Sequence, residues 1–167
     1  MVNLTDQNGH EKRFMKDSKN IYAQTEESKI FFDSNILVYS ADERDLQKKE
    51  IASRLINEIT ATGRGVVSTQ CLQEFFNVAV KKLNLKKDEA KEYVEFFGDI
   101  FSVVQVSVPL ILNAVDISIK TQFSFWDSLV LSTANESNCI IVYSEDLNDG
   151  QIVGGTKILN PFAGLVT

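Results

Sequence analysis

Residues 29–41 read KIFFDSNILVYSA, and this stretch decides how the rest of the chain can be interpreted. Three apolar residues lead directly into Asp33, and an apolar run resumes after the polar pair Ser34 and Asn35. A short apolar run that stops at an acid is typical of a buried strand with the acid at its carboxyl end. Because ligands bind at that edge of open α/β sheets, the question is which other acids reach it.

Strand-like and helix-like segments alternate after this stretch, as in βαβ units, which favour right-handed crossovers and a parallel sheet. The sequence predicts an α/β fold with three layers, α/β/α, around a central, mostly parallel sheet of about five strands. The expected domain covers residues 29–167, and the polar residues 1–28 are expected to form a mobile leader or an appended helix. The expected strands are 29–33, 65–68, 100–108, 140–143 and 157–159, and the expected helices are 36–61, 69–83, 86–97, 109–120 and 125–137.

Composition excludes several classes of protein. The 167 residues are 44% hydrophobic and 24% charged, which is ordinary for one globular domain. There is neither an apolar run of ~18 residues nor a secretory signal, so we expect no membrane association and a cytoplasmic location. His10 is the only histidine, which excludes a histidine-rich zinc site. Cys71 and Cys139 lack CxxC spacing and are expected to be buried free thiols.

Four acids, spread widely along the sequence, are predicted to meet at one edge of the sheet. Asp33 ends the first strand, Glu74 lies early in the helix after the second, Asp127 begins a helix, and Asp146 follows the fourth strand. In a parallel sheet, the carboxyl ends of strands and the amino ends of the following helices share an edge. Carboxylates without histidine form an oxygen-rich site that suits one or two Mg²⁺ or Mn²⁺ ions.

Each acid also has a purely structural interpretation. Asp33 could cap the next helix, and Asp127 is spaced from Ser124 as in a capping box. Glu74 could be exposed on its helix, and Asp146 lies in a sequence that suits a surface turn. The net charge of −6 argues against a protein that coats nucleic acid, although it does not exclude a nuclease.

Four motifs resemble those of the PIN-domain nucleases, especially the VapC-like toxins of type II toxin–antitoxin systems. They are FDSNIL at 32–37, STQCLQEF at 68–75, FWDSL at 125–129 and YSEDLNDG at 143–150. The resemblance covers residues 29–164, and the leader is a departure from it. It implies a PIN-like nuclease domain in which three acids, Asp33, Glu74 and Asp127, form a metal site that Asp146 completes.

The same resemblance implies supporting roles for three further residues. Ser144 matches a small hydroxyl residue beside the last acids, Asn35 matches the polar residue after the first acid, and Asp149 would be an additional acid. The paired lysines at 48–49, 81–82 and 86–87 could contact phosphates, but such pairs are more often solvated helix faces.

The implied function is hydrolysis of RNA phosphodiester bonds by a Mg²⁺- or Mn²⁺-dependent endoribonuclease that acts as a toxin. The implied partners are an RNA substrate, a cognate antitoxin protein and a second copy of the chain in a homodimer. Two alternatives remain open, a housekeeping RNA-processing PIN nuclease and a non-catalytic RNA-binding PIN-like module. A haloacid-dehalogenase-type phosphatase is disfavoured because Asn35 stands where that class has its second Asp. A calcium loop at Asp146 is disfavoured because its glycine comes one position early.

Overall fold

The strands form one sheet whose order places the first strand at its centre. The computed structural model describes residues 28–165, so residues 1–27 of the expected leader lie outside the described part. The strands are β1 Lys29–Phe32, β2 Gly65–Ser68, β3 Ser102–Val104, β4 Cys139–Tyr143, β5 Ile152–Val153 and β6 Thr156–Leu159. The helices are α2 Ser34–Ala41, α3 Leu46–Thr60, α4 Thr69–Lys81, α5 Lys87–Ile100, α6 Val108–Thr121 and α7 Phe125–Glu136.

The strand order is β3-β2-β1-β4-β6-β5. All neighbouring strands pair in parallel except β5, which is antiparallel to β6. The chain first builds outward from β1 to β3 and then returns to place β4 on the other side of β1. The order therefore reverses between β1 and β4, and such a switch point is where open α/β sheets leave a crevice for ligands.

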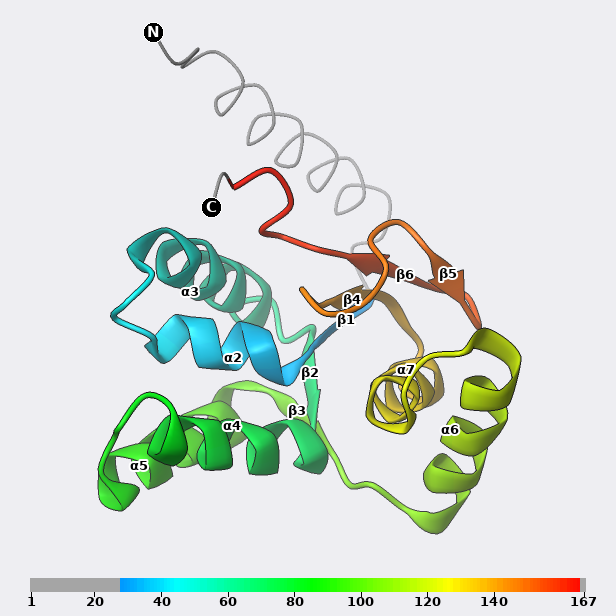
Figure 1. Cartoon of the computed structure of the whole chain (residues 1–167), viewed down its shortest axis with the longest axis horizontal. Helices are drawn as coiled ribbons and strands as arrows, with labels where there is room; N and C mark the ends of the chain where they lie inside the picture. The colour runs from blue at the N-terminus through cyan, green and yellow to red at the C-terminus, as the bar shows by residue number, and fades with distance from the viewer. Residues whose placement is uncertain (1–27, 166–167) are drawn as a thin grey trace, which may run out of the picture.

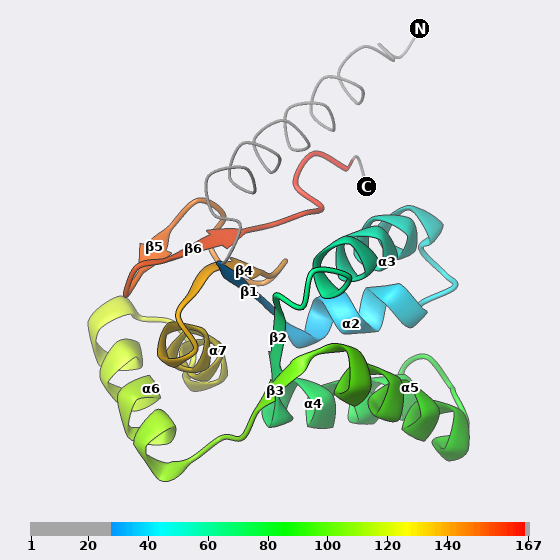
Figure 2. The same cartoon turned by 180° about the vertical axis from the view of Figure 1, so that it is seen from behind.

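The helices cover both faces of the sheet, which confirms the predicted three-layer architecture. Figure 1 shows α2, α3, α4 and α5 on one side of the sheet and α6 and α7 on the other, and Figure 2 shows the same arrangement from behind. The connections between strands explain this division. Helices α2 to α5 connect β1, β2 and β3 on one face, and the chain crosses to the second face only after β3. None of the helices within residues 28–165 has the length and apolarity needed to cross a membrane.

The core forms around the two central strands. Residues 30–32 of β1 are fully buried, as expected for a strand covered on both faces. Phe32 packs against the rings of Phe101 and Tyr143, with centroids 5.1 and 5.6 Å apart. On α4, the buried positions include Cys71, Phe75 and Ala79, four residues apart, which places one face of the helix against the core. The core thus fixes the strand that ends at Asp33.

The helix predicted for residues 36–61 is in fact two helices, and this part of the prediction was wrong. Helix α2 ends at Ala41, and Asp42 is extended. Asp42 accepts hydrogen bonds from the Arg44 amide at 3.0 Å and from its guanidinium at 2.7 and 2.8 Å, and Asp45 caps α3 through the Lys48 amide. Side-chain acceptors of this kind satisfy the backbone at a turn, which allows a helix to stop without proline or glycine.

The strands also differ from the prediction in length and number. The segment 100–108 contributes only Ser102–Val104 because α5 continues to Ile100. A sixth strand, β5, is added by the hairpin whose turn, Gly154-Gly155, has positive φ at both residues. Cys71 and Cys139 are free and buried, as expected.

Candidate active site

The carboxyl ends of β1 and β4 bring the first and last acidic motifs together. The two strands pair Phe32 with Tyr143, and the Asp33 amide donates to the Tyr143 carbonyl at 3.0 Å. Asp33 and Ser144 therefore leave the sheet side by side, although 111 positions separate them in the sequence. This junction is the switch point of the sheet.

Asp33 is a buried carboxylate held by three donors. Its Oδ1 accepts from the Ser34 amide at 2.6 Å, and its Oδ2 accepts from Ser144 Oγ at 2.7 Å and Asn35 Nδ2 at 3.1 Å. Asp33 is also the N-cap of α2, so the structural interpretation of this residue is confirmed. Capping occupies Oδ1, while Oδ2 belongs to the cluster with Asn35 and Ser144.

Asn35 connects the two motifs through both ends of its side-chain amide. Its Nδ2 contacts Asp33 Oδ2, Ser144 Oγ at 3.2 Å and Asp146 Oδ2 at 3.0 Å. Its Oδ1 accepts from the Glu145 amide at 3.3 Å. Asn35 thus links two of the predicted acids, Asp33 and Asp146.

Burial, hydrogen bonds and neighbouring negative charges all act on the carboxyl group of Asp33. The pKa of Asp33 is raised to about 6, chiefly by burial; the hydrogen bonds from Ser144 and Ser34 oppose this shift, and the negative charges of Glu74 and Asp146 add to it. A nearby positive charge would reverse this shift by favouring the ionised form. Glu74 itself lies in the first two turns of α4.

Glu74 is held by Gln70, a residue that the sequence analysis missed. Gln70 Nε2 donates to Glu74 Oε1 at 2.9 Å and also contacts the Trp126 carbonyl at 3.4 Å. Because Trp126 precedes Asp127, this side chain connects the acid on α4 to the beginning of α7. The spacing of four residues between Gln70 and Glu74 on one helix was the available signal.

Asp127 lies in the first turn of α7, in a capping arrangement with Ser124. Ser124 Oγ donates to Asp127 Oδ2 at 2.7 Å, and the Asp127 amide contacts Ser124 Oγ at 3.2 Å. The capping interpretation is therefore confirmed for this residue too. One carboxylate oxygen, Oδ1, has none of these contacts.

Asp149 lies differently from the other acids. Its Oδ1 accepts from the Asn160 amide at 2.8 Å, and the side chain is at an exposed turn. Within the described residues, no contact joins it to Asp33, Asn35 or Ser144. It organises the loop after β6 rather than the acidic cluster.

The side chains of the acidic cluster are of the kind that binds a divalent metal ion, although they do not converge on one position. Between residues 28 and 165, no group of three or more His, Cys, Asp or Glu residues is arranged to hold a metal ion. The cluster nevertheless contains the carboxylates of Asp33 and Asp146 and the hydroxyl of Ser144, and oxygen ligands of this kind are those that Mg²⁺ and Mn²⁺ prefer. Carboxylates repel one another at short distance, so a tighter arrangement requires positive charge between them.

A comparison with protein families assigns the fold and these motifs to one class. The model of the PIN domain matches residues 30–148, a range that contains all four predicted acids. The chain therefore belongs to the PIN domain family. Comparison with curated proteins finds no match.

Solved structures of toxins and toxin–antitoxin complexes share this fold. VapC20 of Mycobacterium tuberculosis, described as a Sarcin-Ricin loop cleaving toxin, has a TM-score of 0.59 and 15% identity over 71% of this chain and 90% of that chain. DNA-bound VapBC from Salmonella typhimurium has a TM-score of 0.60 and 18% identity over 78% and 96%. A toxin–antitoxin complex from Klebsiella pneumoniae has a TM-score of 0.60 and 16% identity over 80% and 98%. At these identities the similarity is one of fold.

Proposed function

We propose that the protein is a metal-dependent endoribonuclease that hydrolyses RNA phosphodiester bonds and acts as the toxin of a toxin–antitoxin pair. The observation that carries this proposal is the meeting of Asp33, Asn35, Ser144 and Asp146 at the switch point of the sheet. Membership of the PIN domain family supports the nuclease class.

The proposed ligands are Asp33, Glu74, Asp127 and Asp146, which would hold one or two Mg²⁺ or Mn²⁺ ions. When bound, such ions supply positive charge that activates water and stabilises the charge developing on the phosphate. Asn35 and Ser144 orient Asp33 and Asp146 by hydrogen bonds, and Gln70 does the same for Glu74. Such orienting contacts around ligands strongly affect both metal affinity and activity.

The test is cleavage of RNA by the purified chain with Mn²⁺ or Mg²⁺. We expect cleavage that chelator stops, with products carrying 5′-phosphate and 3′-hydroxyl ends. Asp33→Asn and Asp127→Asn should each reduce the rate by at least about 100-fold, because both remove a charged ligand. Asp99→Asn, at an exposed position on α5, is the matched control and should retain the wild-type rate.

Full activity in both site variants would refute the metal-site assignment. RNA binding that persists in chelator without any product would instead favour the non-catalytic RNA-binding module. Circular dichroism of each variant separates loss of activity from loss of the fold.

The role as a toxin rests on the solved structures with the same fold, which are described as a Sarcin-Ricin loop cleaving toxin, a DNA-bound VapBC and a toxin–antitoxin complex. Expression of the chain alone should arrest growth, and co-expression with the product of an adjacent small gene should relieve the arrest. Cleavage without growth arrest would favour a housekeeping RNA-processing nuclease.

A further inference from the structure

Behind the acidic cluster, three side chains from different elements form an ion-pair group that the proposed chemistry does not use. We propose that Lys48, Tyr39 and Glu145, together called the anchor, fix the position of the side of the site that carries Asn35 and Asp146. The three are positioning residues. The effect of the anchor on metal affinity rests on the proposed function, whereas its effect on the position of the loop does not.

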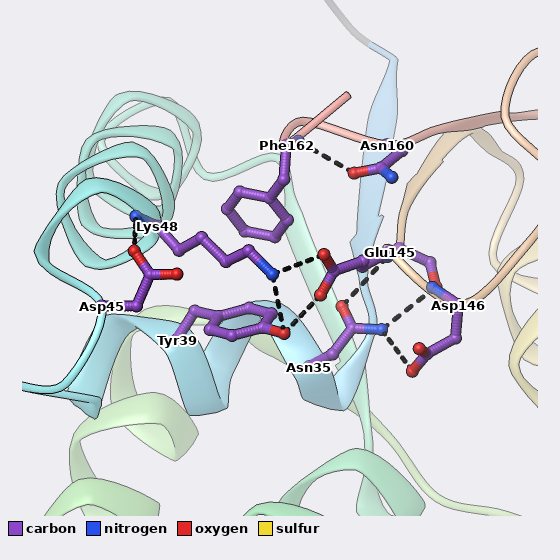
Figure 3. Close-up of polar contacts among 9 residues, drawn as sticks. Asn35, Tyr39, Asp45, Lys48, Glu145, Asp146, Asn160 and Phe162 are labelled. Atoms are coloured by element: carbon purple, nitrogen blue, oxygen red, sulfur yellow. Dashed lines mark hydrogen bonds and ion pairs between the residues drawn. The ribbon is translucent and has the colours of Figure 1, made fainter. Parts of the chain in front are cut away.

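The contacts within the anchor are short and come from three segments. Lys48 Nζ, from the first turn of α3, donates to Glu145 Oε1 at 2.5 Å and to the Tyr39 hydroxyl at 3.1 Å. The Tyr39 hydroxyl also donates to the other oxygen of Glu145. Figure 3 shows the Lys48 side chain extending between the rings of Tyr39 and Phe162 toward the carboxylate of Glu145.

The anchor is largely removed from solvent, which distinguishes it from an ordinary surface ion pair. The side chains of Lys48 and Glu145 are 16% and 26% exposed. Lys48 Nζ lies 4.4 Å from the centroid of the Tyr39 ring and 5.5 Å from that of Phe162, and the two rings are 4.9 Å apart. Cation–π contact and partial burial both strengthen a charge pair relative to one in water.

The anchor reaches the acidic cluster through the backbone of Glu145. Its side chain is held by α2 and α3, while its amide donates to Asn35 Oδ1 at 3.3 Å. This bond determines which end of the Asn35 amide is the acceptor and so turns Nδ2 toward Asp33 and Asp146. Tyr39 lies one helical turn after Asn35 on α2, so one helix face presents both residues to the loop 144–146.

The loop after β6 completes the anchor from the other side. Asn160 Oδ1 accepts from the Phe162 amide at 2.8 Å, and Asp149 Oδ1 accepts from the Asn160 amide at 2.8 Å. Asp149 thereby holds the segment that places the Phe162 ring over Lys48. This contact gives Asp149 an indirect connection to the site, beside the supporting role that the resemblance implies.

The first measurement needs no metal and no RNA. Lys48→Met keeps the apolar stem but removes the charge, and we expect hydrogen exchange of the Glu145 amide, followed by NMR in the full chain, to accelerate about 10-fold in this variant. Lys49→Met is the matched control, because Lys49 is the next residue on α3 and pairs instead with Glu43, away from the site. It should change the exchange rate by less than about 2-fold.

The second measurement is calorimetric titration of the full chain with Mn²⁺ in the absence of RNA. Lys48→Met should raise the dissociation constant about 10-fold, and Lys49→Met should leave it unchanged. The double variant Lys48→Met/Glu145→Gln should bind no worse than Lys48→Met alone, because residues that act as a pair are not additive.

The inference is overturned if Lys48→Met lowers only the melting temperature and leaves both exchange and affinity at wild-type values. It is also overturned if Lys49→Met reproduces the effects of Lys48→Met. Should Lys48→Met fail to fold, Tyr39→Phe, which removes only a hydroxyl, decides by the same two readouts. A wild-type chain that binds no Mn²⁺ would refute the proposed function, while the exchange comparison would still decide whether the anchor positions the loop.

Discussion

At the scale of single residues, Asp33 combines two roles that the sequence presents as alternatives. It caps α2 with one oxygen and joins the acidic cluster with the other, so capping does not argue against a ligand role. Its burial has a cost, because a carboxylate removed from water and placed near Glu74 and Asp146 prefers to be protonated.

This preference predicts how the stability of the metal-free chain depends on pH. The pKa of Asp33 is raised from 3.8 to about 6, chiefly by burial, so the folded state binds this proton more tightly than the unfolded state does. The favourable contribution is therefore present below pH 4 and is lost as pH rises through about 6. Asp33→Asn lacks this loss and should be more stable than wild type at pH 7, by on the order of 2–3 kcal/mol.

Urea unfolding in chelator at pH 4, 5, 6 and 7 measures this difference. Asp99→Asn is the control, since its carboxylate is exposed in the wild type. A stability difference between Asp33→Asn and wild type that is the same at pH 4 and pH 7 would contradict the assigned shift.

At the scale of elements, the beginning of α4 determines where Glu74 lies. Ser68 ends β2 and caps α4, with its buried Oγ 3.2 Å from the Cys71 amide. Glu74 follows in the second turn of α4, where Gln70 donates a hydrogen bond to its carboxylate. A serine at the junction of strand and helix thus connects local capping to the placement of an acid.

Replacement of this cap should weaken the fold measurably. Ser68→Ala is expected to lower the free energy of unfolding by about 1 kcal/mol, because an amide of the first turn loses its acceptor. Ser107→Ala is the matched control, since Ser107 occupies the N-cap of α6 without a side-chain hydrogen bond. Denaturant unfolding of the two variants compares them directly, and equal losses would show that the Ser68 bond is not responsible.

At the scale of the whole molecule, helix α6 leaves apolar surface uncovered. Val108, Leu112 and Ile119 are 68%, 61% and 74% exposed, and they are spaced by four and seven residues along one side of the helix. Contiguous exposed apolar surface of this kind marks interaction sites in soluble proteins. We propose that a second copy of the chain covers it, in the homodimer that the family resemblance implies.

Light scattering coupled to size-exclusion chromatography tests the homodimer. The wild type should have about twice the 18.8 kDa mass of the chain. Leu112→Glu should yield the monomer, because a buried unpaired charge opposes association. Asp99→Asn, an exposed change on α5 rather than α6, should leave the dimer intact. A wild type that elutes as a monomer at all concentrations would refute the proposal.

The sequence by itself determined the alternation of strands and helices, the central buried strand and the four acids near strand ends and helix beginnings. These features depend on hydrophobic periodicity and on residues adjacent in the chain, which are visible without coordinates. The parallel topology that follows from them was enough to predict that Asp33 and Asp146 would meet. The break between α2 and α3 was missed because the acids at 42 and 45 suit a helix surface as well as a turn.

Only the tertiary structure decided which side chains hold the acids in place. The link of Gln70 to both Glu74 and the Trp126 carbonyl, and the pairing of Lys48 with Glu145 across 97 positions, depend on how elements pack. A lysine in an exposed-looking pair such as 48–49 gives no local sign that one member is buried between two rings. Local sequence determined which acids stand near strand ends and helix beginnings. Packing at the switch point of the sheet determined which side chains contact them, because contacts between distant segments exist only once the core has formed.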